Sequence, residues 1–185
     1  SCSNDNESIE SNQSNPNQIS FEEENPLPSY LNVTGYNEQT TLYTNTIQEK
    51  EIGFFFKPLK KGKINSLVVK LPSTDSNLEV RIRDLLAHTI VRTEFINVNT
   101  ANSEIVKNIV PLELEKNRDY AITMITNNYY AKSKVNLGIM NHPITIGNFK
   151  INGSYLSNCD PSNPSFITLI GIYNGDCSFN FLPTE

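Results

Sequence analysis

From residue 30 onward, apolar side chains recur at every second position of the chain far more often than at a helical spacing. Leu78, Val80 and Ile82, for example, alternate with charged residues. A period of two is typical of a strand with one buried face. Runs of this kind, rich in β-branched and aromatic residues, lie at Ile52–Phe56, Ile64–Leu71, Leu78–Ile82, Thr89–Val98, Ile105–Leu114, Tyr120–Met124, Val135–Ile139, Ile144–Ile151 and Phe166–Tyr173.

Turn-forming residues separate these runs at hairpin intervals, as at Pro58–Gly62, Asn127–Asn128 and Asn152–Gly153. About ten short strands at this spacing predict an all-β fold, an antiparallel β-sandwich of jelly-roll-like form. A short helix is expected at most near Asp84–Ala87, and no longer helix is predicted.

One hairpin can be predicted in register. Asn174–Gly175 is a favoured dipeptide for a two-residue type I′ turn. Such a turn pairs Tyr173 with Asp176 and Ile172 with Cys177, and it directs the Cys177 side chain toward the core.

The first 29 residues have a different composition from the rest of the chain. They are almost wholly Ser, Asn, Gln, Glu and Pro, with isolated apolar residues. Such a segment buries too little apolar surface to offset the entropy lost on ordering. We therefore expect a disordered tether over residues 1–29 and a single sandwich domain over residues 30–185.

Length and charge narrow the function classes. The 185 residues suit one ordinary domain with a tail. The net charge of -5 argues against nucleic acid as a partner, because phosphate binding needs clustered Lys and Arg. No apolar run reaches the roughly 18–20 residues that span a bilayer.

Cys2 stands at the head of the polar segment, followed by Ser3, Asn4 and Asp5. This start resembles a bacterial lipoprotein of the Bacteroidetes type after removal of its signal peptide, with lipid carried on Cys2. The resemblance implies the bacterial cell envelope, as an outer-membrane or cell-surface protein that meets the membrane only through its anchor. A chain that merely happens to begin Ser-Cys is the alternative.

Cys159 and Cys177 are the other two cysteines, and neither has a spacing typical of zinc ligands. In an oxidising compartment we expect them to form a disulfide. Two free buried thiols, or one nucleophile and one bystander, are the alternatives.

Three segments between Glu51 and about Tyr130 are similar to an exported bacterial domain of unknown function, the DUF4082 type. They read EIGFFFKPLKKGKINSLVVKL (Glu51 to Leu71), VRIRDLLAHTIVRTEF (Val80 to Phe95) and LELEKNRDYAITM (Leu112 to Met124). The resemblance implies a jelly-roll-like sandwich, often compared with carbohydrate-binding modules, and it implies no activity.

The sequence contains no convincing pattern for catalysis. Nucleophile-elbow, HExxH, Walker and dinucleotide glycine motifs are absent, and we expect no catalytic residue and no cofactor. Oxygen-rich turns can bind calcium. The candidate calcium ligands, for which ordinary turn formation is the alternative, are Asn158, Asp160, Asn174 and Asp176.

Binding is the more promising class of function. Tyr129, Tyr130 and Tyr155 fall in expected loops, where a tyrosine ring can stack on a sugar or contact a protein. Packing over the sandwich edge is the alternative for these rings. We therefore expect a noncatalytic binding module for carbohydrate or protein. A structural or adhesion component that assembles by strand addition is the second hypothesis, and a hydrolase acting on glycosides is the third.

Overall fold

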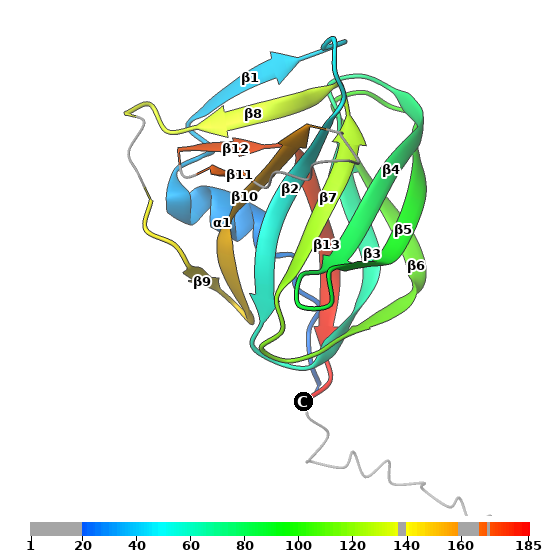
Figure 1. Ribbon diagram of the computed structural model, residues 1–185, viewed down its shortest axis with the longest axis vertical. Helices are drawn as coiled ribbons and strands as arrows, with labels where there is room; N and C mark the ends of the chain where they lie inside the picture. Colours follow the sequence, from blue (N-terminus) through cyan, green and yellow to red (C-terminus); the bar gives the residue numbers. More distant parts are fainter. Residues whose placement is uncertain (1–19, 137–139, 159–166, 170) are drawn as a thin grey trace, which may run out of the picture.

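The computed structural model describes residues 20–136, 140–158, 167–169 and 171–185. Within these residues the chain forms one helix and a series of antiparallel strands (Figure 1). In chain order they are α1 (Pro26–Thr34), β1 (Gln39–Tyr43), β2 (Lys50–Pro58), β3 (Gly62–Lys70), β4 (Asp75–Asp84), β5 (Thr89–Val98), β6 (Glu104–Leu114), β7 (Tyr120–Thr126), β8 (Tyr129–Ser133), β9 (Ile144–Ile146), β10 (Phe149–Asn158), β11 (Ile167–Leu169), β12 (Ile172–Asn174) and β13 (Asp176–Pro183).

The strands form three sheets. The large sheet has the order β11-β10-β2-β7-β4-β5, with β9 beside β10, and the smaller sheets have the orders β13-β3-β6 and β1-β8-β12. In Figure 1 the sheet β13-β3-β6 and α1 lie behind the large sheet, and β1-β8-β12 closes one end. The predicted all-β antiparallel sandwich is confirmed.

The core lies between the large sheet and the layer behind it. On β2 the alternate residues Ile52, Phe54 and Phe56 are all buried. On β13 the core positions include Phe179, whose ring centroid lies 4.8 Å from that of Phe56 and 5.4 Å from that of Phe149. Each such aromatic pair contributes about 0.5–1.5 kcal/mol beyond the burial of its area. Period-two alternation in the sequence therefore identified the buried faces of these strands correctly.

Helix α1 was not predicted, and it moves the start of the folded part. The Asn25 side chain caps the helix by accepting a hydrogen bond of 3.2 Å from the Leu27 N–H, and Pro26 lies at the first helical position. Proline is tolerated there because that N–H needs no partner within the helix. Leu27 is buried. The expected boundary at residue 29 was therefore wrong, since residues 26–29 belong to the domain; residues 1–19, with Cys2, lie outside the described part.

The predicted hairpin around Asn174–Gly175 was wrong. β12 pairs with β8, whereas β13 pairs with β3, so the chain passes from one sheet to another at this turn. Gly175 adopts a positive φ of 85° and donates its N–H to the Tyr130 carbonyl at 2.8 Å. Asn174 is the last residue of β12 and does not have a positive φ, so the predicted two-residue type I′ turn does not form; Gly175 alone has the left-handed conformation between β12 and β13.

Two other expected elements differ in detail. The run Ile144–Ile151 is divided into β9 and β10 by a turn at Gly147, and Asn152–Gly153 forms a bulge within β10 instead of a turn. Of the expected strand Val135–Ile139, Val135 lies in a turn and residues 137–139 are outside the described part.

Candidate functional site

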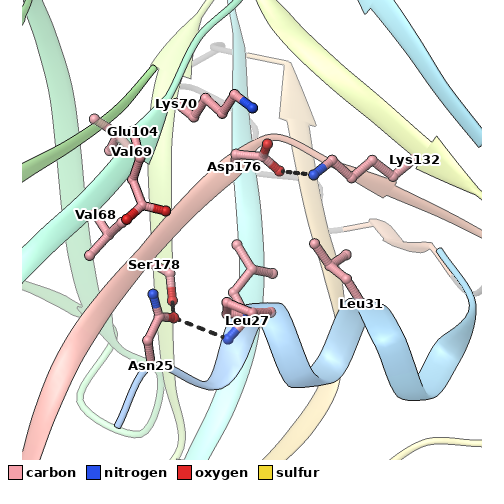
Figure 2. A pocket seen from close by; sticks show the side chains of 11 residues that line it. Asn25, Leu27, Leu31, Val68, Val69, Lys70, Glu104, Lys132, Asp176 and Ser178 are labelled. Atoms are coloured by element: carbon pink, nitrogen blue, oxygen red, sulfur yellow. Dashed lines mark hydrogen bonds and ion pairs between the residues drawn. The ribbon is translucent and has the colours of Figure 1, made fainter. Parts of the chain in front are cut away.

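A pocket of about 230 Å³ opens between α1 and the outer face of the sheet β13-β3-β6 (Figure 2). Its aliphatic wall is formed by Leu27 and Leu31 from the helix and by Val68 from β3. Charged side chains also line the pocket, namely Lys70, Glu104, Lys132 and Asp176. The pocket thus combines an apolar surface with charges of both signs.

Strand register brings three of these charges together. Lys70 on β3 lies directly opposite Asp176 on β13 and opposite Glu104 on β6. Directly opposed residues in antiparallel strands project to the same face of a sheet. Asp176, Lys70 and Glu104 therefore form a row of alternating charge across the sheet. Lys132 approaches that row from β8, and its Nζ lies 2.8 Å from Asp176 Oδ1.

Two of the four charges have no ionic partner among the residues that the structure describes. Neither Lys70 nor Glu104 has an oppositely charged group within 4 Å in that part of the chain. Lys70 Nζ lies 5.6 Å from the centroid of the Tyr130 ring, a cation-π contact. An ammonium and a carboxylate at the mouth of the pocket are thus available to a ligand.

At the start of α1, a short hydrogen-bond network connects the helix to β13 beside the pocket. Ser178 Oγ donates to Asn25 Oδ1 at 2.6 Å, and the same oxygen accepts the Leu27 N–H that begins the helix. One amide oxygen therefore joins β13 to α1. The pocket wall made by the helix is positioned by this contact.

The three tyrosines predicted to bind ligand lie elsewhere than expected. Tyr129 and Tyr130 are on β8 and Tyr155 is on β10, with relative exposures of 9%, 6% and 0%. Tyr129 stacks on Tyr43 at a centroid distance of 5.1 Å, and burial raises the pKa of the Tyr129 and Tyr130 hydroxyls. The prediction of exposed loop tyrosines was wrong, because all three rings pack against the protein itself.

The predicted calcium ligands and disulfide fall partly outside the described residues. This holds for Cys159, for Asp160 and for the side chain of Asn158. Asn174 is buried, and Asp176 is paired with Lys132. The described residues contain no group of three or more His, Cys, Asp or Glu that could hold a metal ion. Both the calcium site and the disulfide stay predictions.

Cys177 is completely buried in the core, as the sequence predicted, although β13 and not a hairpin places it there. Burial raises the pKa of its thiol, so the group is protonated at neutral pH. A thiol in this state is a poor nucleophile.

A second charged cluster lies on the outer face of the large sheet. Glu51 on β2 accepts hydrogen bonds from Arg83 Nε at 2.9 Å and from Thr123 Oγ1 at 2.7 Å, and Arg81 Nη1 lies 3.5 Å away. Arg81 also binds Glu79 at 2.6 Å on the same strand. The Glu51 carboxylate is already enclosed by partners, so this cluster joins β2, β7 and β4 and leaves little capacity for a ligand.

Of the described pocket residues, sequence reasoning had selected only Asp176, and that as a candidate calcium ligand. Lys70 and Glu104 are charged residues at the ends of strands, and such residues are usually solvated. Asn25 stood in a segment expected to be disordered. The one sequence signal available was the Asn-Pro pair before Leu27, which is typical of a helix N-terminus.

No protein-family model matches this chain, and no curated protein is significantly similar to it in sequence. The resemblance to the DUF4082 type therefore stays a prediction. Among the helices of the described residues, none is long and apolar enough to cross a membrane.

Proposed function

We propose that this chain is a noncatalytic binding module whose ligand is a segment of another protein, held in the pocket between α1 and the sheet β13-β3-β6. The observation that carries the proposal is the composition of the pocket. An aliphatic wall of Leu27, Leu31 and Val68 lies next to the unpaired charges of Lys70 and Glu104. A polypeptide offers aliphatic and charged side chains at close spacing, which complements such a surface.

A protein ligand suits the pocket better than a carbohydrate does. Sugars bind proteins through hydrogen bonds together with stacking on aromatic rings. Among the residues that the structure describes, no aromatic residue lines this pocket, and the three tyrosines expected to stack on sugar are buried. Aliphatic contacts and single charges are instead the means by which proteins contact one another.

The proposal can be tested with a phage-displayed peptide library selected on the immobilised protein. Peptides that bind the pocket should lose about ten-fold or more in affinity when Lys70→Ala or Glu104→Ala removes a charge-assisted contact of about 1.5–3 kcal/mol. Affinities of the selected synthetic peptides are then measured by isothermal titration calorimetry. Thermal unfolding of each variant shows whether it is folded.

Lys63 and Glu113 provide a matched control, because they oppose each other at the other end of the same two strands. Lys63→Ala and Glu113→Ala should leave peptide affinity unchanged. Equal loss in both pairs of variants would contradict the pocket as the site. Glycan-array binding that depends on Lys70, without peptide binding, would replace protein by carbohydrate as the ligand.

A further inference from the structure

Most long sheet edges in the described part of this protein are blocked against pairing with another chain. An open edge presents unpaired backbone N–H and C=O groups, and proteins commonly cover such edges. The edge of β13 is covered by the segment that precedes α1. Glu24 donates its N–H to the Phe181 carbonyl at 2.9 Å, and Phe181 donates its own to the Glu24 carbonyl at 3.0 Å.

The edges β5 and β6 are blocked by each other's side chains. Lys107 from β6 donates to the Phe95 carbonyl of β5 at 2.8 Å, and Arg92 from β5 donates to the Val110 carbonyl of β6 at 3.1 Å. Pro111 also lies within β6 and has no N–H to offer. On each of these two edges, a side chain of the other strand therefore occupies one backbone acceptor.

β1 is the exception among the longer edge strands. It pairs with β8 on one side, and in the described residues no other strand pairs with it. The remaining edge strands, β9, β11 and β12, have three residues each. In Figure 1 β1 lies at the outer margin of the molecule, and the side chains of all five of its residues are exposed.

The sequence of β1 shows no device against self-pairing. Its five residues, Gln39 to Tyr43, carry no charge, although charges are the usual protection of an edge. Leu42 and Tyr43 are 56% and 42% exposed. Other exposed apolar residues adjoin this sheet, with Ile47 shortly after β1 and Ile172 on β12.

We propose that two copies of this chain associate by antiparallel pairing of their β1 strands across a twofold axis at Thr41. In this register Thr41 faces Thr41, Thr40 faces Leu42 and Gln39 faces Tyr43. No like charges meet, and a Thr–Thr pair is favourable between antiparallel strands. The sheets of the two copies join in the order β12-β8-β1-β1-β8-β12.

This association is independent of the peptide ligand but affects how the pocket is displayed. Lys132, at the mouth of the pocket, lies on β8, the neighbour of β1, and is paired with Thr40 in register. A dimer would therefore present two pockets at a constant separation. Two linked sites bind a partner that carries two segments more tightly than one site does.

Opposite charges placed on the twofold axis provide the test. Thr41→Lys and Thr41→Glu each bring like charges face to face, so each variant alone should shift dimer formation to an about ten-fold higher protein concentration. An equal mixture of the two variants brings opposite charges together and should restore the dimer. Sedimentation-velocity ultracentrifugation over a concentration series measures all three samples beside the wild-type protein.

Thr93→Lys is the matched control, since Thr93 is an exposed threonine on the blocked edge β5. It should dimerise as the wild-type protein does. A wild-type protein that stays monomeric at millimolar concentration overturns the proposal. So does dimerisation of Thr41→Lys equal to that of wild type, or a mixture of the two Thr41 variants that does not associate.

Discussion

At the scale of single residues, Glu51 is a carboxylate on a sheet face whose lost hydration is replaced by neighbouring side chains. Its side chain is only 7% exposed, but it has hydrogen bonds from Arg83 and Thr123 and a nearby charge from Arg81. A carboxylate taken out of water is tolerated only when partners replace the lost hydration. The three strands that carry these residues are thereby held in one register.

Replacing Glu51 by glutamine should destabilise the protein by about 1.5–3 kcal/mol, the usual contribution of hydrogen bonds to a charged group. The amide keeps the shape of the side chain but removes the counter-charge of Arg83, while Arg81 keeps its ion pair with Glu79. Urea unfolding followed by far-UV circular dichroism measures the change. Glu79→Gln is the control; it breaks the more exposed pair with Arg81 and should cost less than about 1 kcal/mol. Equal costs for the two variants would contradict the role given to Glu51.

The sequence could not identify these contacts of Glu51. Arg81 and Arg83 are two positions apart, so strand alternation is enough to place them on one face. Glu51 lies 32 residues before Arg83, and only the pairing of β2 and β4 with β7 brings them together.

At the scale of elements, β2 and β7 approach unusually closely at Gly53. A Cβ atom built on Gly53 collides with the carbonyl oxygen of Ile122 in β7. Backbone atoms in the centre of a sheet cannot move aside without breaking ladder hydrogen bonds. A residue without a side chain is therefore required here, in the middle of the large sheet.

Gly53→Ala should cost about 3 kcal/mol or more, at or above the upper end of ordinary overpacking, because the obstacle is backbone. Gly171→Ala is the control, since a Cβ atom there meets no atom of the described residues within 4 Å; its effect should stay within about 0.5 kcal/mol. Thermal unfolding of both variants by calorimetry gives the comparison. A Gly53→Ala protein as stable as Gly171→Ala would show that β2 and β7 can separate at this point.

The sequence predicted some helices and strands correctly and missed others, and each outcome has a physical reason. β5 was predicted with its observed bounds, because Thr89–Val98 is rich in β-branched residues and lies between turns. β8 was assigned to a loop, since it follows β7 after only two residues and carries no long alternating run. α1 was missed because the polar composition of residues 1–29 predicted disorder, whereas Pro26 in the first turn is compatible with a helix.

At the scale of the whole molecule, ion pairs make stability depend on pH. Burial raises the pKa of Asp84, but hydrogen bonds from Arg118 and from the Ala87 and Leu86 N–H groups more than offset it, so the pKa lies below the ordinary value of 3.8. Burial likewise raises the pKa of Glu94, and Lys107 and Arg92 bring it below the ordinary 4.5. Both carboxylates therefore favour the folded state when ionised.

The free energy of unfolding should be highest near neutral pH. It should fall once the pH drops below the ordinary pKa values of the Asp84 and Glu94 carboxyls, toward their lower pKa values in the folded state. A lowered folded-state pKa means that the unfolded chain binds protons first, so acid favours unfolding. Asp84→Asn should cost about 1–2 kcal/mol at pH 7, and the difference from wild type should shrink in acid. Urea titrations at a series of pH values measure both curves; a difference independent of pH would contradict this account.

The amino-acid sequence alone was sufficient for the fold class and for most strand positions. Burial of one strand face is a local property, so period-two alternation records it directly in β4, where buried and partly exposed residues alternate from Leu78 onward. The tertiary structure alone decided which strands are neighbours, because backbone hydrogen bonding is the same for any pair of strands. For that reason the Asn174–Gly175 turn connects two sheets, and Lys70, Glu104 and Asp176 lie in one row beside α1. The pocket is built from five separate segments of the chain, and no pattern within any one of them could have predicted it.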